Sequence, residues 1–179
     1  MMIDSIKRRR SVRRFEDREV EEEKINEILE AAMFSPSAHA KYPWEIIVVT
    51  DKGKRDALSK TTVWSSFASE APVCFVVLGD EEESERWIED GSIVSEHIWL
   101  ESVNQGLGGC WIQVRGGTTD DPEKDPEEYV RRILEIPEKW RVLSILAVGY
   151  PATEKSPHKK SNLEYEKIHS EKYGNTYSK

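Results

Sequence analysis

A dense basic segment stands near the start of the chain, at residues 8–15, where the sequence is RRRSVRRF. Its like charges repel one another, so the segment predicts either a bound anion or a set of acidic side chains that offsets the repulsion. Arginine donates hydrogen bonds in a planar fork that matches the oxygens of a phosphate group, and a serine hydroxyl adds a short neutral donor. The segment is therefore a candidate phosphate-binding site.

Two other interpretations of this basic segment stay open. In the first, it is a solvated face that pairs with the glutamates at positions 19 and 21–23. In the second, it is a nucleic-acid patch or a localisation signal. A formal net charge of -8, with no second basic stretch that contains aromatic residues, argues against nucleic acid as a partner.

The remaining motifs are informative through what they lack. Residues 106–109, GLGG, follow a predicted helix and precede a predicted strand, which reverses the dinucleotide-binding order and indicates a helix end with close packing. The sequence has no G-x-S-x-G elbow and no metal-site spacing around its histidines. Cys74 and Cys110 lie in apolar segments and are expected to be buried, reduced thiols. An enzyme with this sequence is expected to take its chemistry from a cofactor.

Helices are expected wherever apolar residues recur with helical spacing. The segment 21–35 has one apolar face, and glutamates in its first turn complement the helix dipole. The segment 85–105 is apolar on more than one side, so it is expected to be buried inside the domain or in a dimer. Further helical segments are expected at 3–10, 51–60 after a turn, 64–69, 126–134 and 163–173.

Four strands are expected, at residues 45–50, 72–79, 110–114 and 142–149. The second is apolar almost throughout, which is typical of a central strand. A loop is expected at 35–44 and an extended polar arm at 151–162. Helices alternate with strands through the middle of the chain, and this order predicts helices packed on a small sheet.

The length and composition indicate one domain over residues 1–179. The chain has 37% hydrophobic and 34% charged residues, with its large apolar residues in clear clusters. No apolar run approaches the length of a membrane span, and no apolar stretch follows the charges at the N-terminus. We therefore expect a cytoplasmic protein with neither a membrane nor a nucleic acid as its partner.

Four motifs together resemble the FMN-dependent nitroreductase family over nearly the whole chain. They are, in order, RRSVRRF at 9–15, SPSAHAKYPW at 35–44, GLGGCWIQ at 106–113 and VGYP at 148–151. The resemblance implies an α+β fold with three layers, α/β/α, in which helices flank a mixed, mainly antiparallel sheet. It also implies an interlocked homodimer that binds FMN at the subunit interface.

The same resemblance assigns roles to individual residues. The implied cofactor-binding residues are Arg9, Arg10, Ser11 and Arg13 at the flavin phosphate; Pro36, Ser37, Ala38 and His39 over the flavin ring; Trp111, Ile112 and Gln113 along its reactive face; and Lys159 and Lys160, which return to the phosphate. Lys41 is a candidate for stabilising the reduced flavin or for steering an anionic nicotinamide. No other side chain is implied to be catalytic, because the flavin carries the chemistry.

The implied activity is the reduction of nitroaromatics, quinones or similar small electron-poor acceptors by NADPH or NADH, through FMN and with ping-pong kinetics. Ala40 departs from the family's pattern, since its methyl group cannot hydrogen-bond the pyrimidine edge of the flavin. The alternatives are a reductive dehalogenase or flavin-fragmenting member of the same superfamily, a protein that stores FMN or transfers electrons, and a structural protein whose arginines pair with its own glutamates.

Overall fold

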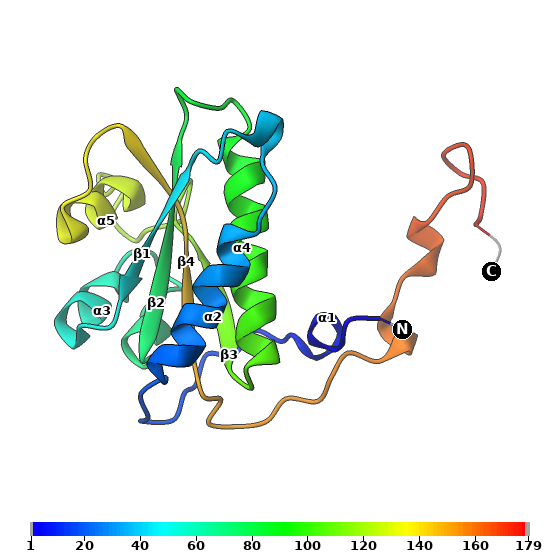
Figure 1. Cartoon of the computed structure of the whole chain (residues 1–179), viewed down its shortest axis with the longest axis horizontal. Helices are drawn as coiled ribbons and strands as arrows, with labels where there is room; N and C mark the ends of the chain where they lie inside the picture. The colour runs from blue at the N-terminus through cyan, green and yellow to red at the C-terminus, as the bar shows by residue number, and fades with distance from the viewer. Residues whose placement is uncertain (1, 178–179) are drawn as a thin grey trace.

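The computed structural model describes residues 2–177, in which helices and strands alternate along the chain (Figure 1). All four predicted strands are present, with ends shifted by one or a few residues. In chain order the elements are α1 (Asp4–Arg8), α2 (Glu22–Met33), β1 (Trp44–Val49), α3 (Lys52–Leu58), β2 (Val73–Asp80), α4 (Trp87–Asn104), β3 (Gly108–Gln113), α5 (Pro126–Leu134) and β4 (Trp140–Gly149). Short 3-10 turns lie at Ala38–Ala40, Ser66–Ser69, Lys160–Asn162 and Tyr165–Lys167.

The four strands form one sheet in the order β1-β2-β4-β3. Each neighbouring pair in this order is antiparallel. The expectation of a mixed sheet is therefore wrong for these strands: β2 and β3 run in the same direction around α4, but β4 inserts between them. The parallel contact is a single bridge between Ser11 and Gly109. The central position expected for the second strand is confirmed, because β2 lies between β1 and β4.

Helices cover both faces of the sheet, which gives the three layers visible in Figure 1. On one face α2 and α4 pack through residues that include Ile28 and Ile98. On the opposite face α3 and α5 pack through Leu58 and Val130. Successive residues of β2 contribute to the two cores in turn, which explains its nearly continuous apolar sequence. No helix within residues 2–177 is long and apolar enough to cross a membrane.

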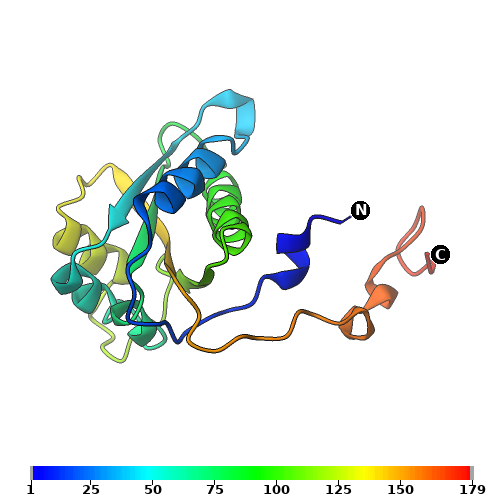
Figure 2. The ribbon, with the colours of Figure 1, turned by 60° about the horizontal axis from the view of Figure 1, so that its bottom comes forward.

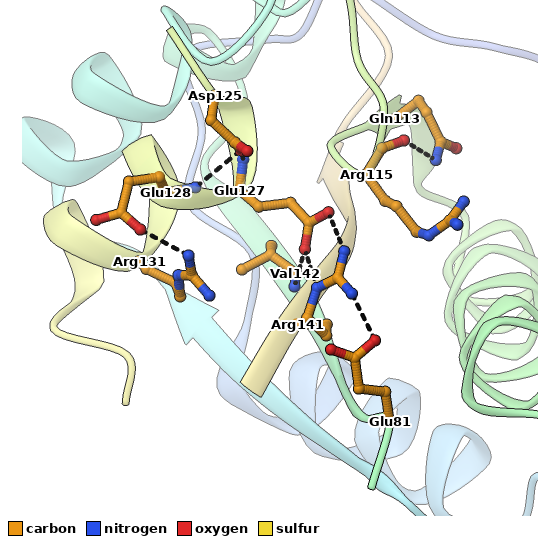
Figure 3. Close-up of polar contacts among 9 residues, drawn as sticks. All are labelled: Glu81, Gln113, Arg115, Asp125, Glu127, Glu128, Arg131, Arg141 and Val142. Atoms are coloured by element: carbon orange, nitrogen blue, oxygen red, sulfur yellow. Dashed lines mark hydrogen bonds and ion pairs between the residues drawn. The ribbon is translucent and has the colours of Figure 1, made fainter. Parts of the chain in front are cut away.

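A nearly buried ion pair joins α5 to the start of β4 (Figure 3). The Glu127 carboxylate accepts from Nε and Nη2 of Arg141, both at 2.8 Å, and from the backbone N–H of Val142 at 3.2 Å. Arg141 also donates through Nη1 to Glu81 at 2.6 Å. The hydrogen bonds to Glu127 raise the pKa of Arg141. Together these contacts fix the end of the sheet where β3 leads into the loop at Arg115.

The C-terminal segment leaves the body of the protein and extends away from it together with α1 (Figure 2). The helix predicted over residues 163–173 is wrong: this segment contains a 3-10 turn at Tyr165–Lys167, followed by bends and by an isolated bridge between His169 and Thr176. Its large apolar residues, such as Leu163 and Ile168, are exposed. Short helices are marginal in water without a packed face, and this segment has no core of its own chain against which to pack.

Candidate functional site

The basic segment of residues 8–15 is held against the start of β3. The backbone N–H of Val12 donates to the carbonyl of Gly109 at 2.9 Å, and the Val12 side chain is buried. A side chain at Gly108 would exclude this contact, because a Cβ there would lie 2.6 Å from a methyl group of Val12. The glycines at 106–109 therefore act as predicted: Gly106, at φ +78°, ends α4, and Gly108 permits close packing.

The other edge of the basic segment pairs with the chain that follows β4. Phe15 and Pro151 form an antiparallel bridge, and the N–H of Ala152 donates to the carbonyl of Arg14 at 3.0 Å. Farther along the same pairing, Lys155 Nζ donates to the carbonyl of Ser11 at 2.6 Å. Arg10 reaches the carbonyl of Ser156 in the same arm. The segment thus lies between β3 and the arm, with its backbone fixed on both sides.

Positive charge gathers around Ser11 as a result. The Arg9 guanidinium lies over the ring of Trp99 at 4.3 Å, and the Arg13 guanidinium lies 5.7 Å from the ring centre of Phe67. Beneath them, burial raises the pKa of the Cys110 thiol, while Arg13, a hydrogen bond with Ser11, Lys155 and Arg9 act in the opposite direction. Cys74 and Cys110 are both buried and free, as expected. Fixed donors and cations around one serine suit a phosphate group.

Lys155 belongs to this cluster although the sequence analysis did not single it out. The bridge between Phe15 and Pro151 sets an antiparallel register, and counting four residues back along one strand and four forward along the other places Lys155 opposite Ser11. The position of Lys155 can therefore be inferred only when the pairing of Phe15 with Pro151 is already known. The predicted pair Lys159 and Lys160 instead lies exposed on the arm, beyond the point where the N–H of His158 approaches the carbonyl of Lys7 at 3.4 Å.

The predicted residues of β3 lie along an outer edge of the sheet. β3 pairs with β4 on one side, and the carbonyl of Gly109 points to the other side, toward Val12. Backbone groups alternate along an antiparallel strand, so those of Trp111 and Gln113 also point outward from β4. The Trp111 indole donates to Gln113 Oε1 at 3.0 Å. In turn, Gln113 Nε2 donates to the carbonyl of Arg115 at 2.7 Å, as Figure 3 shows. Ile112 is buried and supports the strand from beneath.

A cleft of about 270 Å³ opens beside this edge. Arg13 lines it together with all three predicted β3 residues, so the structure brings these two groups of predicted residues together. The remaining lining comes from the loop before β2 and the loop after β3: Thr62, Trp64, Phe67, Gly116, Gly117 and Thr118. Trp64 is an exposed aromatic residue that the sequence analysis treated only as part of a helical segment.

The loop predicted to cover the flavin ring has an unusual backbone. His39, Ala40 and Tyr42 have φ values of 55°, 53° and 51°, in the left-handed region that glycine normally occupies. Two hydrogen bonds hold this shape: the N–H of Ala38 donates to the buried Asp90 carboxylate at 2.9 Å, and the N–H of Tyr42 donates to the Ser37 hydroxyl at 2.8 Å. Such strain is often found at binding sites.

This loop lies at the opposite end of α4 from the basic segment (Figure 1). Ala38 contacts Asp90 in the first turns of α4, whereas the basic segment contacts Gly109, just beyond the end of that helix. Arg9 lies over Trp99, which at 1.5 Å per residue is about 14 Å along the helix from Asp90. Within one chain the loop with Ser37, Ala38 and His39 is therefore separated from the arginines along α4. Lys41 also lies at this end, where its Nζ donates to the carbonyl of Glu83 at 2.6 Å. Pro36 follows Ser35, whose hydroxyl lies 2.8 Å from His97 Nδ1, midway along the helix.

Comparisons with known proteins agree with this geometry. The chain matches the model of the "Nitroreductase family" over residues 6–65 and 54–150. A provisionally named NADH dehydrogenase/NAD(P)H nitroreductase of Methanothermobacter thermautotrophicus is 35% identical over 175 residues, which are 96% of this chain and 87% of the relative. The FMN reductase (NAD(P)H) of Bacillus subtilis is 28% identical over 97% of this chain and 75% of its own length.

Solved structures show the same similarity in three dimensions. An FMN-dependent nitroreductase from Clostridium difficile R20291 superposes with a TM-score of 0.93 at 40% sequence identity, over 96% of this chain and 100% of that chain. A provisionally named NADH dehydrogenase/NAD(P)H nitroreductase from Parabacteroides distasonis superposes with a TM-score of 0.85 at 33% identity, over 95% of this chain and 97% of that chain.

Proposed function

Because this chain belongs to the nitroreductase family, we propose that it is an FMN-dependent oxidoreductase that takes electrons from NADH or NADPH and passes them to a small electron-poor acceptor. Nitroaromatics and quinones are the acceptor classes that we propose. The observation that carries the proposal is the group of cations around Ser11: Arg13 lines the cleft beside the open edge of β3, and Lys155 donates to the Ser11 carbonyl. Arg10 and Lys155 line a second cleft, beside Gly106 and Gly108. The names of the relatives above support the same cofactor and reductants.

We place the flavin phosphate at Arg9, Arg10, Ser11 and Arg13, and we add Lys155. These residues fit a dianion because their backbone is fixed between β3 and the arm before any ligand arrives. Their donors are charged or short, and charge-assisted hydrogen bonds are the strong ones. Lys159 and Lys160 remain in the proposal as cations farther along the arm, where they add to the positive potential around the phosphate.

We place the flavin ring beside β3, along the outward-pointing backbone groups of Trp111 and Gln113. When bound, FMN would supply the redox chemistry, because flavins transfer hydrides and no protein side chain here does. Outward backbone N–H groups can stabilise negative charge that develops on a bound ring, since fixed dipoles need no reorganisation. One open cleft that receives the nicotinamide and the acceptor in turn predicts ping-pong kinetics.

A second copy of the chain completes this site in our proposal. The loop with Pro36, Ser37, Ala38 and His39 is built as a binding loop, yet it contacts Asp90, which lies about 14 Å along α4 from Trp99, the residue beneath Arg9. A partner subunit would bring its own loop, with Lys41, over the flavin ring. The exposed apolar residues of α1 and the arm support an interface there: Met2, Ile3, Ile6, Leu163, Ile168 and Tyr173.

The proposal is tested by the visible spectrum of the purified protein, after FMN is added and the free flavin is removed by desalting. We expect a retained flavin band that bleaches when NADH or NADPH is added without oxygen and returns when a quinone is supplied. Retained flavin that neither nucleotide bleaches would favour the storage or electron-transfer alternative. Protein that emerges colourless would contradict the assignment of the cofactor.

A further inference from the structure

Trp64 is an exposed indole on a rigid support. Its side chain is 76% exposed, whereas Phe67, three residues later, is 5% exposed. Large aromatic side chains normally bury most of their surface, so an indole left in water on the body of the protein needs a reason. Trp64 lines the cleft beside β3 and also the neighbouring cleft of about 490 Å³, and Arg13 lines both as well.

Buried hydroxyl groups fix the loop that carries Trp64. The Ser65 hydroxyl donates to the carbonyl of Ser59 at 2.8 Å and accepts the N–H of Thr62 at 2.9 Å. The N–H of Val63 donates to the carbonyl of Thr118 at 3.0 Å, which ties this loop to the loop after β3. Ser65 itself is completely buried. The backbone that carries the indole is therefore fixed before a ligand binds. Little conformational entropy is then lost when a ligand packs against the indole.

The charge beside Trp64 is positive. Arg14, whose side chain is 79% exposed, lines the larger cleft next to Arg13, and its ion pair with Glu70 is an exposed one at 3.5 Å. Exposed ion pairs of this kind are weak, so the guanidinium is available to a ligand anion. An aromatic face together with an arginine fork matches a planar ring that carries a carboxylate.

We propose that Trp64 and Arg14 select the electron acceptor: they favour a planar aromatic compound that carries an anionic group, with the ring against Trp64 and the anion toward Arg14. This inference rests on the proposed function, since it places the acceptor at Trp64, which lines both the cleft beside β3 and the larger cleft that Arg14 lines. It leaves the flavin phosphate to Arg9, Arg10, Ser11, Arg13 and Lys155, so Arg14 is not needed for holding the cofactor.

The test compares 4-nitrobenzoate with 4-nitrobenzamide, two acceptors of nearly equal shape of which only the first is charged. Binding to the oxidised protein is measured by equilibrium dialysis without any nucleotide, so that no reduction occurs. We expect 4-nitrobenzoate to bind more tightly. Trp64→Ala should weaken the binding of both compounds by about tenfold, and Trp64→Phe should restore most of it, because an aromatic face is what the site supplies.

Arg14→Gln should remove most of the preference for the anion and leave the binding of the amide unchanged. Arg86→Gln is the matched control, because Arg86 has a similarly exposed and weak ion pair with Glu89 at 3.8 Å, outside these clefts. In reduction assays, a substitution that weakens the binding of an acceptor should raise the KM for that acceptor.

Equal affinity of wild type and Trp64→Ala for 4-nitrobenzoate would overturn the inference, as would equal affinity of wild type for the two compounds. Flavin retention and bleaching, measured on the same samples, report on the proposed function separately. A Trp64→Ala protein that keeps its flavin but loses the aromatic anion supports the inference. A wild-type protein that binds no flavin contradicts the proposed function whatever the dialysis shows.

Discussion

At the scale of single residues, the cations around Ser11 are the part of the protein with the clearest chemical purpose. The guanidinium groups of Arg9 and Arg13 each lie over an aromatic ring, and Lys155 donates to the carbonyl of Ser11. An aromatic ring beneath a guanidinium stabilises the charge without using its hydrogen-bond donors. The donors of both arginines are therefore left to bind an anion.

The double substitution Arg9→Ala/Arg13→Ala should lower the affinity for FMN by at least a hundredfold, because hydrogen bonds to charged groups contribute about 1.5–3 kcal/mol each. The measurement is a titration of apoprotein that follows the quenching of flavin fluorescence. Riboflavin, which lacks the phosphate, should bind wild type and the double variant about equally.

Arg86→Ala/Arg131→Ala is a control that removes the same amount of charge from other parts of the surface, where both arginines pair with glutamates on their own helix or beside it. It should leave the affinity for FMN near that of wild type. An equal loss in the control and in the Arg9/Arg13 variant would mean that net charge, rather than this cluster, attracts the cofactor.

At the scale of elements, the basic segment can pack against β3 because residue 108 is a glycine and has no side chain. Gly108→Ala would place a Cβ 2.6 Å from Val12 and should displace the segment from β3. We expect a loss of about 1–3 kcal/mol in the free energy of unfolding, as in other overpacked cores, together with weaker FMN binding. Both are measured on the same preparation, by urea unfolding and by flavin titration.

A second change should rescue the first. Val12→Ala/Gly108→Ala removes the methyl groups that clash and should recover much of the FMN affinity. Gly106→Ala is the matched control: Gly106 has φ +78° with open space around it, so alanine there strains the backbone without pressing on the basic segment. It should lower stability and leave FMN affinity unchanged; an equal effect at both glycines would refute the packing argument.

The start of the arm, at Tyr150, is also hydrogen-bonded to Glu21, the residue just before α2. The Tyr150 hydroxyl donates to Glu21 at 2.5 Å, and Arg18 pairs with the same carboxylate at 2.6 Å. The bond from Tyr150 is the main cause that lowers the pKa of Glu21 from 4.5 to about 2. Because the folded-state pKa is the lower one, this contact favours the folded state above pH 4.5 and is lost as the pH falls toward 2.

We therefore expect the Glu21 carboxylate, followed by NMR, to titrate well below pH 4. Tyr150→Phe should move its midpoint toward 4.5, the ordinary value of the group. A wild-type midpoint already near 4.5 would show that the contact does not form in solution.

Some elements of the fold could be predicted from the sequence, and others could not. The apolar runs of β2 and β4 and the periodic face of α2 determine secondary structure locally, so all four strands were found. The segment 163–173 has a helical pattern as well, but a pattern forms a helix only when its apolar face is covered. The all-antiparallel pairing depends on where β4 inserts, and no local signal specifies that.

Some residues of the candidate site could likewise be predicted from the sequence, and others could not. The basic segment and the glycines at 106–109 could be predicted to matter, since each has an unusual composition. Lys155 could not, because its role depends on a pairing with a segment 144 residues away. Trp64 could not be predicted to line the site either: large aromatic residues bury most of their surface in most proteins, and only the structure shows that this one is exposed.

At the scale of the whole molecule, the shared site that we propose requires a dimer, because the loop 36–42 and the arginines lie apart along α4 within one chain. We expect size-exclusion chromatography with light scattering to give twice the mass of one 20.7 kDa chain. A monomer that retains FMN would contradict the shared site.

Mixing two inactive variants gives a sharper test of the shared site. One variant has Arg9→Ala/Arg13→Ala, and the other has its loop altered by Pro36→Ala/Ser37→Ala/His39→Ala. If each site takes its arginines from one chain and its loop from the other, a mixed dimer contains one intact site and one doubly damaged site. Flavin binding should reappear after unfolding and refolding the two together. No recovery in a confirmed mixed dimer would place both groups of residues on one chain.

The double anchorage of the basic segment also sets the order in which the protein can mature. A ribosome makes the arginines before Gly109 and before the chain from Tyr150 to Lys155, which hold them in the folded protein. A growing chain therefore lacks this double anchorage until residue 155 has been made. If FMN binds where we propose, it can be loaded only after that point, and a chain that stops before residue 150 should not retain the cofactor.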